Sequence, residues 1–529
     1  MTGPQDAGAT SRTRQALNEP RCNRPDDSRS SRYTYPAMTT STQSQFQFLA
    51  KRPNIPRVGC AVLGAAFSMG MAWATHAASP GWPQWRGPSA TGAAPDANPP
   101  VKWSETNNVK WKVKLPGFGT STPIIWNDRV FIQTAVDTGK QGAGSPRAMR
   151  ANVGPNVAGL PQAANPAQTP ETPREGTGRR RGPAGGGGRG GMAAPAPTQV
   201  HQFVLMAVDG ASGRTVWQKT VREEVPHEGH HRDHGFSSSS PITDGQHVYA
   251  YFGSRGLYCY DLAGNLKWQK DLGRMATRNG FGEGSSPALH GGVLVINWDH
   301  EGEDFIAAFD KTNGRELWRT KRDELTTWTT PLVVEHEGKP QVVVPASAMI
   351  RSYDLRTGAE LWRCSGMTAN VIPTPVANFG MVYCTSGFRG SSLLAIKLGR
   401  TGDLTSSDAI AWQHQKGTPY VPSPLLAGER IYFFSENSGI LSCFNAKTGK
   451  AHFEAERLGS LSGVYASPVA AGGRVYLVGR TGSSVVLQQS DKLEVLATNV
   501  LDDKFDASPA VDGKRLFLRG HENLYCLAE

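Results

Sequence analysis

Ionisable side chains are concentrated in two short stretches of the chain. Residues 225–236 hold four histidines within eight residues, and residues 297–304 hold one histidine and four carboxylates. Imidazoles and carboxylates bind divalent metals and also act as general acids and bases. These stretches therefore predict a metal or acid–base site, and the alternative is a pair of solvated polar loops. The candidate metal ligands are His227, His230, His231, Asp299, His300 and Glu301.

Residues 227–231 also match the H-E-x-x-H pattern of zinc proteases. That chemistry requires both histidines on one face of a helix, with the glutamate between them. Pro226 precedes the pattern, Gly229 interrupts it, and strand-like sequence lies on both sides. A helix is disfavoured here, so the sequence does not predict a protease.

A second group of candidates could bind a ligand by stacking and by charge. Residues 280–284, GFGEG, lead into a strand rather than a helix, so they lack the helix terminus of a phosphate loop and instead form a turn that presents Glu283. Other aromatic and cationic residues lie in loops on the same predicted face. The candidate ligand-binding residues are Glu283, Trp298, Trp328, Arg351, Arg389 and Tyr420.

The elements that must position these residues belong to a repeat. Residues 352–362, SYDLRTGAELW, combine a short apolar segment, an Asp, a Thr-Gly turn and a Leu-Trp pair, and variants recur near residues 209, 261, 310 and 445. The pattern predicts a hairpin in which Gly adopts positive φ at low cost. The Trp then offers a large flat face to the neighbouring unit.

A second motif, Ser/Thr-Pro followed by an apolar run and a Gly turn, alternates with the first. Beyond the first interval its prolines are 41 to 49 residues apart, a period typical of four-stranded propeller blades. Eight prolines mark the motif: Pro123, Pro241, Pro287, Pro331, Pro375, Pro424, Pro468 and Pro509.

The sequence thus predicts an all-β protein, an eight-bladed propeller of four-stranded antiparallel blades over 109–529. The eighth outer strand is Val109–Leu115, which closes the ring by pairing with Leu524–Leu527. A weak match at Leu493–Leu496 supplies the outer strand of the seventh blade. Alternation of the strands places the candidate residues on one face, around the mouth of the axis, where propellers bind ligands.

Residues 82–88, WPQWRGP, together with these repeats, resemble a bacterial family of exported proteins with pyrroloquinoline-quinone-like (PQQ-like) propeller repeats. The wider superfamily includes quinoprotein alcohol dehydrogenases and the non-enzymatic propeller lipoprotein of the outer-membrane β-barrel assembly machinery. In that superfamily the Asp-x-x-Thr-Gly-x-x-x-Trp element is the tryptophan-docking motif that joins adjacent blades.

The resemblance raises PQQ with calcium, or a divalent metal, as a cofactor. Quinoprotein dehydrogenases carry a disulfide between adjacent cysteines over the quinone, and this chain has no Cys-Cys pair. They also use a Glu/Asn/Asp calcium set, for which Glu283, Asn297 and Asp299 have the right residue types. No catalytic residue is assigned.

Charge and cysteine usage exclude other classes of protein. Residues 1–78 carry a net charge of +5 and residues 138–199 a net charge of +6, which together account for the whole formal charge of +11. The folded part is therefore neutral overall, and we expect no nucleic-acid partner. Cys259, Cys443 and Cys526 share one repeat position and are expected to be small buried residues.

The N-terminal region predicts export. Residues 1–50 are polar and are expected to be disordered, and residues 51–78 have the basic, apolar and small-residue order of a signal peptide, or of an uncleaved membrane anchor. Residues 79–108 are expected to form a connector. Residues 138–199, rich in Gly, Pro and Ala, predict a disordered insertion in the first blade.

These observations favour an exported, periplasmic or extracellular, non-catalytic module that binds a protein, a glycan or a small molecule at its axial face. The alternative is a quinone- or metal-dependent oxidoreductase, or a hydrolase, with its site in the His/Asp/Glu-rich loops. The sequence does not decide whether the protein is an enzyme.

Overall fold

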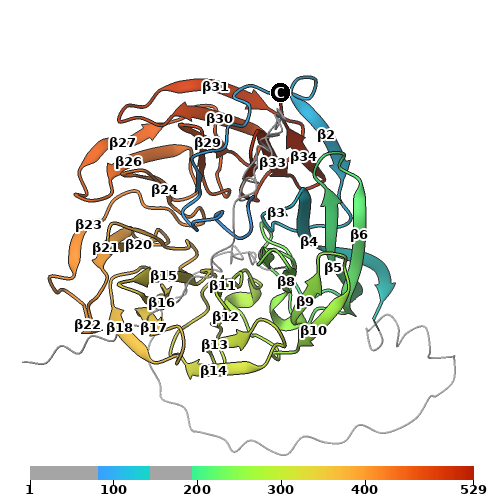
Figure 1. The fold of residues 1–529 in the computed structure, drawn as a ribbon, viewed down its shortest axis with the longest axis horizontal. Coiled ribbons are helices and arrows are strands. Elements are labelled where there is room, and N and C mark those ends of the chain that lie inside the picture. The colour runs from blue at the N-terminus through green and yellow to red at the C-terminus, as the bar shows by residue number, and fades with distance from the viewer. Residues whose placement is uncertain (1–80, 143–193) are drawn as a thin grey trace, which may run out of the picture. The chain divides into compact units, whose positions relative to one another are not determined.

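The strands form a ring of eight sheets around a central axis (Figure 1). The computed structural model describes residues 81–142 and 194–529; the predicted disordered leader and signal segment, and most of the insertion, lie outside these residues. Within the described part the predicted eight-bladed propeller of four-stranded antiparallel blades is confirmed.

Each blade has four antiparallel strands, and in blades 1–7 the chain adds them from the axis outward. Blade 1 contains β3 (Ile124–Trp126), β4 (Arg129–Gln141), β5 (Gln199–Asp209) and β6 (Thr215–Glu224). Blade 2 contains β7 (Ile242–Thr243), β8 (His247–Tyr251), β9 (Leu257–Asp261) and β10 (Leu266–Lys270). Blade 3 contains β11 (Ala288–His290), β12 (Val293–Trp298), β13 (Phe305–Asp310) and β14 (Glu316–Lys321). Blade 4 contains β15 (Leu332–His336), β16 (Lys339–Val344), β17 (Ile350–Asp354) and β18 (Glu360–Cys364), with the short β22 (Gly402–Asp403) added in parallel outside β18.

The other four blades follow the same order. Blade 5 contains β19 (Val376–Asn378), β20 (Met381–Ser386), β21 (Ser392–Lys397) and β23 (Ile410–His414). Blade 6 contains β24 (Leu425–Ala427), β25 (Arg430–Phe434), β26 (Ile440–Asn445) and β27 (Ala451–Arg457). Blade 7 contains β28 (Val469–Ala471), β29 (Arg474–Val478), β30 (Ser483–Gln488) and β31 (Val495–Val500). Blade 8 contains β32 (Ala510–Asp512), β33 (Arg515–Arg519) and β34 (Asn523–Leu527), and its outer strand is β2 (Val109–Lys114). Two 3₁₀ turns, η1 (Gly253–Arg255) and η2 (Arg278–Gly280), complete the elements.

The ring is closed by its two ends, as predicted. β2, drawn in blue, pairs antiparallel with β34, drawn in red, through Trp111 opposite Cys526 and Val113 opposite Leu524. This pairing covers a sheet edge that would otherwise be open to association. The outer strand of blade 7 starts two residues later than the predicted Leu493–Leu496 and continues to Val500.

The hydrophobic core lies between adjacent blades. One cluster, for example, combines Val376 and Tyr383 of blade 5 with Leu426 and Ile431 of blade 6. The five cysteines of the described residues are free and buried in this core, as expected for small apolar side chains. Among residues 81–142 and 194–529 there is no helix of the length and apolarity that a membrane crossing needs.

In five of the eight blades a tryptophan of the repeat motif joins the blade to the next one by a hydrogen bond and a close contact, whereas Trp362 of blade 4 donates to Gln341 of its own blade. The indole N–H of Trp318 donates to the carbonyl of Leu355 in the next blade (2.9 Å). Gly358 of that blade has φ +73°, and a Cβ there would lie 2.5 Å from the Trp318 ring, so only glycine fits. Four further pairs have the same bond, at 2.8–3.0 Å: Trp111 to Gly210, Trp217 to Leu262, Trp268 to Lys311, and Trp412 to Ala446.

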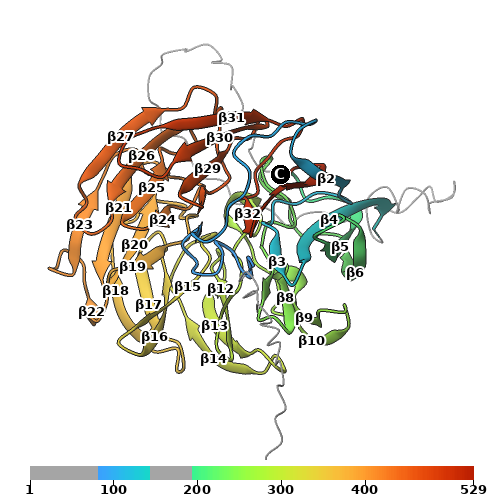
Figure 2. The same ribbon diagram turned by 45° about the horizontal axis from the view of Figure 1, so that its top comes forward.

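The segment before β2 lies at the centre of the ring, where it bonds to the innermost strands of several blades (Figure 2). Trp82 exchanges two backbone hydrogen bonds with Ile125 of blade 1, at 2.8 and 3.0 Å. The short β1 (Ala93–Ala94) pairs in parallel with β28, the innermost strand of blade 7. Segment 82–94 thus contacts the innermost strands of blades 1 and 7, which flank blade 8.

The first part of the predicted insertion belongs to the sheet. β4 continues through Gln141, which pairs with Gln199 of β5, and the N–H of Gly142 donates to the carbonyl of Thr198. Residues 143–193 of the insertion lie outside the described part of the chain. The two strands therefore extend blade 1 on the face that carries the candidate residues.

Candidate ligand-binding funnel

A ring of hydroxyl groups surrounds the axis, formed by the residue that precedes each repeat proline. The backbone N–H of one such residue donates to the hydroxyl of its counterpart in the next blade, and seven bonds of 2.9–3.2 Å link the blades in this way. A hydroxyl is needed because the acceptor must be short and must lie on the axis side of the strand. The members of this hydroxyl ring are Thr122, Ser240, Ser286, Thr330, Thr374, Ser423, Ser467 and Ser508.

Trp85 of the central segment completes the ring. Its indole N–H donates to the hydroxyl of Thr374 (2.9 Å). The segment around it is tied to several innermost strands, because the carbonyls of Pro83, Thr91 and Gly92 accept N–H bonds from blades 2, 6 and 7. Trp85 is therefore held near the axis by bonds to several blades.

A cavity of about 580 Å³, here called the funnel, opens above Trp85 and the hydroxyl ring. Its walls come from the loops that enter the innermost strands and from the loops between second and third strands. They carry six aromatic side chains together with polar groups. The aromatic residues are Trp85, Phe281, Trp328, Phe388, Tyr420 and Tyr465.

The free charge in the funnel is positive. Asp506 in the wall is bonded by Arg480 (2.6 Å) and His521 (2.8 Å); burial opposes ionisation, but these two bonds outweigh it and hold the pKa of Asp506 below its usual value. Asp233 also contacts Arg480, at 3.3 Å. Among the described residues, Arg278 and Arg389 of the wall form no ion pair. Because the two acids of the wall, Asp233 and Asp506, are matched by Arg232 and Arg480, the funnel favours an anionic ligand.

His234 forms part of the wall as a neutral imidazole. Its Nε2 bonds the carbonyl of Glu283 (3.0 Å), and its Nδ1 bonds the hydroxyl of Ser238 (2.9 Å). Burial in the wall lowers the pKa of His234 to about 4. At neutral pH this histidine therefore positions the loop 225–236 and adds no charge to the site.

Of the six residues expected to bind a ligand, three line the funnel: Trp328, Arg389 and Tyr420. Trp298 instead is 2% exposed and stacks on Phe305, with ring centroids 5.5 Å apart. Arg351 forms ion pairs with Glu324 and Glu360. Glu283 lies behind the funnel wall, where the N–H and hydroxyl of Ser254 and the guanidinium of Arg255 bond its carboxylate.

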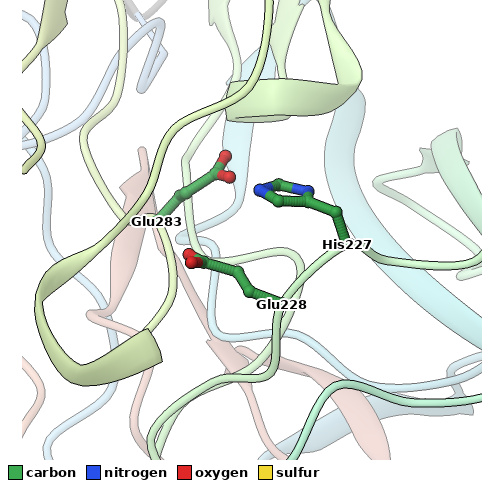
Figure 3. A group of neighbouring side chains, drawn as sticks. All are labelled: His227, Glu228 and Glu283. Atoms are coloured by element: carbon green, nitrogen blue, oxygen red, sulfur yellow. The ribbon is translucent and has the colours of Figure 1, made fainter. Parts of the chain in front are cut away.

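Among the described residues, one group lies at metal-ligand spacing: His227, Glu228 and Glu283, whose ligand atoms are within 4.8 Å of one another (Figure 3). All three groups already hold protein partners. Nε2 of His227 bonds the carbonyl of Met275 (2.7 Å), and Glu228 accepts the hydroxyl of Thr277 (2.5 Å). The group has the geometry of a metal site, and most of its atoms join the loops of blades 2 and 3, whereas Nδ1 of His227 is buried without a hydrogen-bond partner.

The other five expected metal ligands bond to residues other than His227. Nδ1 of His230 bonds the carbonyl of His231, whose own ring packs edge-on against Phe281. Nδ1 of His300 accepts N–H bonds from Ala276 and Gly302. Glu301 accepts the hydroxyl of Thr326 (2.9 Å).

Asp299 is wholly buried in an ion pair with Arg322. Nε and Nη2 of Arg322 bond its two carboxylate oxygens, at 2.6 and 3.2 Å, and Thr327 and Asn297 add further donors. Each carboxylate oxygen of Asp299 therefore already accepts at least one protein hydrogen bond. The sequence pattern of this loop thus reflects a buried network rather than an open set of ligands.

Comparison with known proteins agrees with the fold. A family model for PQQ-like repeats, described as outer membrane protein assembly factor BamB, matches residues 201–455. Residues 201–455 of this chain belong to the PQQ-like β-propeller repeat family. No curated protein matches the sequence.

Two solved structures share the fold of this chain over most of its length. The quinohemoprotein alcohol dehydrogenase from Comamonas testosteroni superposes with a TM-score of 0.53 at 10% identity, covering 86% of this chain and 81% of the other. A europium-containing methanol dehydrogenase gives 0.52 at 9% identity, covering 85% and 98%. BamB from Moraxella catarrhalis, at 14% identity, covers 64% and 94% with a TM-score of 0.42, too low to bear on the fold.

The residues of this PQQ-like propeller do not fit the calcium set considered for a quinone cofactor. Glu283 is paired with the guanidinium of Arg255, and Asp299 with that of Arg322. These positive charges would repel a divalent cation. Their carboxylate oxygens already accept protein hydrogen bonds. No chemical step through a quinone is therefore derived for this chain.

Several residues of the funnel were not singled out from the sequence. Trp85 was seen as part of WPQWRGP, but the motif does not reveal that this residue lies at the axis. The Ser/Thr residues before the prolines were recognised as a repeat mark, and their recurrence at one position of every blade is the signal that could have predicted a ring.

Proposed function

We propose that this protein binds a small organic molecule in the funnel and acts as a non-catalytic binding module. The observation that supports this most directly is the cavity of about 580 Å³ above Trp85. Its volume falls within the range of about 300–1,000 Å³ typical of small-molecule sites, which combine apolar walls with a few polar groups.

The lining indicates the kind of ligand. Six aromatic side chains offer faces for stacking, and the hydroxyl ring offers hydrogen-bond partners at the bottom. Arg278 and Arg389 add positive charge near the mouth, with the Arg389 guanidinium 5.3 Å from the centre of the Phe388 ring. A ring-containing molecule with at least one carboxylate or phosphate suits these walls.

Export forms part of the proposal. Residues 51–78 would direct the chain across a membrane as a signal peptide, or hold it there as an anchor, so that the funnel faces the periplasm or the exterior. Residues 79–108 then begin the folded module, which continues to residue 529. A protein partner at the same face is a further candidate, suggested by the BamB description of the matching family model.

The second candidate is an oxidoreductase or hydrolase that uses His227, Glu228 and Glu283 with a bound metal. Its support is the mutual distance of at most 4.8 Å between their ligand atoms (Figure 3). Metal analysis of protein purified without a histidine tag tests it, and less than about 0.2 equivalents of every metal would remove it.

The experiment for the leading proposal is untargeted identification of ligands released from native protein, followed by a thermal-shift panel of the compounds found. We expect a compound of drug-like size that raises the Tm of the wild type by binding only the folded state. A Tyr420→Ala variant should lose most of that shift. Absence of any released compound and of any shift would overturn the proposal.

A further inference from the structure

A second and much smaller cavity lies behind the funnel wall, between blades 2 and 3. We call it the side pocket. It has a volume of about 20 Å³ and shares Ser238, Gly284 and Trp328 with the funnel. Trp328 is fixed between the two cavities because its indole N–H donates to the carbonyl of Gly282 (2.7 Å).

Four buried polar atoms that line the side pocket have no hydrogen-bond partner: Ser237 Oγ, Ser239 Oγ, Tyr251 OH and Asn297 Oδ1. Each residue is at most 5% exposed. A buried polar group without a partner is costly, and native proteins leave only a few per hundred residues. Four around one cavity indicate that the cavity is filled.

The volume limits the occupant to a very small group. A site needs roughly 10–15 Å³ by this measure to hold a water molecule. The side pocket exceeds that threshold, and at about 20 Å³ it lies at the lower limit of the roughly 20–30 Å³ that two separate water molecules require by the same measure. A single water molecule typically makes two to four hydrogen bonds, and the four unpartnered atoms can supply that number.

The charges around the side pocket favour a neutral occupant. Two carboxylates line it, Glu283 and Asp299, and each is matched by a guanidinium. Arg255 bonds Glu283 at 2.9 Å, and Arg322 bonds Asp299 at 2.6 Å. No net negative charge is left to hold a cation.

The types of the four atoms specify what the occupant must do. The amide oxygen of Asn297 can only accept a hydrogen bond, whereas each of the three hydroxyls can donate or accept. A cation would bind the oxygens but leave all three hydroxyl protons unpaired. One water molecule can accept from two of the hydroxyls and donate to the third hydroxyl and to Asn297 Oδ1, so that each of the four atoms has a partner.

We propose that the side pocket is a binding subsite for one ordered water molecule, which forms the polar backing of the funnel wall behind Trp328. This inference concerns the free protein and does not depend on the identity of the funnel ligand.

The direct test is a crystal structure at about 1.6 Å or better of protein crystallised with rubidium chloride and, separately, with calcium chloride. We expect a single peak in the side pocket, about 2.6–3.2 Å from at least three of the four atoms, without anomalous signal from either cation. An empty pocket, or an anomalous peak within it, would overturn the proposal.

Thermal unfolding gives an independent readout, because a water-filled pocket and an empty pocket predict different changes in Tm for a variant that lacks the Tyr251 hydroxyl. If water holds the Tyr251 hydroxyl, Tyr251→Phe should lower the Tm by about 1–3 °C. The control is Tyr383→Phe, which removes a hydroxyl that donates to the carbonyl of Ala446 (3.0 Å) and sets the scale for a satisfied group. An unchanged or higher Tm for Tyr251→Phe would show that this hydroxyl has no partner to lose, against the proposal.

Neither test requires a funnel ligand. The water site can therefore fail while the proposed binding function stands, and the function can fail while the water site stands.

Discussion

The indole N–H of Trp85 lies 2.9 Å from the hydroxyl of Thr374, 289 residues further along the chain. This bond joins the central segment to the hydroxyl ring, and it sets the floor of the funnel. The site therefore depends on a segment outside the repeats as well as on the blades. Its position is defined by backbone bonds to several blades rather than by local secondary structure.

Trp85→Phe keeps an aromatic floor but removes the hydrogen bond, so we expect the free energy of unfolding to fall by about 1 kcal/mol and ligand binding to persist. Trp85→Ala removes the floor itself and should weaken ligand binding at least about tenfold, as loss of a buried aromatic contact does. Urea unfolding and isothermal titration with the released ligand measure the two effects. As the matched control, Trp217→Phe also loses one bond, to Leu262, yet should bind ligand like the wild type.

Gly358→Ala tests the contact between blades. Its Cβ would lie 2.5 Å from the Trp318 ring at φ +73°, whereas Gly338 has φ +72° and nothing within 4 Å of the added atom. Gly338→Ala should cost about 1 kcal/mol of unfolding free energy, from the backbone alone. Gly358→Ala should cost at least about 2 kcal/mol more, because a packed ring must move. Equal losses in the two variants would show that the Trp–Gly contact does not hold the blades together.

Stability should fall as the pH drops from about 6.5 to about 4 through His234. Its pKa is lowered to about 4 in the folded state by burial, so in this window the unfolded chain binds the proton and the folded chain does not. The stabilisation is complete above pH 6.5 and is lost as the pH falls. Because an edge of the ring is exposed to the funnel, we expect a loss of only about 1–2 kcal/mol, below the full value of the shift.

Urea unfolding at pH 7 and at pH 4.5 measures this effect. In His234→Gln the difference between the two pH values should shrink by that amount, while other groups continue to titrate as in the wild type. A variant with the same pH dependence as the wild type would contradict the neutral, buried state of His234.

Asp299→Asn should lower the free energy of unfolding by about 3–5 kcal/mol, because it leaves the buried guanidinium of Arg322 without its counter-charge. Adding Arg322→Met should recover part of the loss, since a buried pair replaced by uncharged groups is often nearly neutral. A double-mutant cycle measured by urea unfolding gives the coupling. Independent, additive losses would mean that the two side chains do not act as a pair.

The ring could be predicted because its signals are local and repeated. The Asp–Gly–Trp hairpins and the Ser/Thr-Pro strands recur with one period, and their spacing fixes the number of blades. Even the closing strand was found, since Trp111 occupies the repeat position of the other outer-strand tryptophans. Each of these features is a property of a few neighbouring residues.

The site was less predictable because its contacts are distant. Trp328, Arg389 and Tyr420 were placed correctly from the strand order, as the loops of one face must share the axis. Trp298 does not line the funnel, because it ends β12 and packs inward on Phe305 instead of lying in a loop. The role of Asp299 could not be seen without Arg322, which lies 23 residues away on the next turn of the same blade.

We propose above all that a small molecule occupies the funnel. A crystal structure of the protein purified from its native source, without added ligand or tag, is the decisive test. We expect continuous density above Trp85 that is too large for water and lies against the aromatic walls, with an anionic group near Arg278 or Arg389. A funnel that contains only separate water molecules, or a bound molecule outside it, would refute the proposed occupancy.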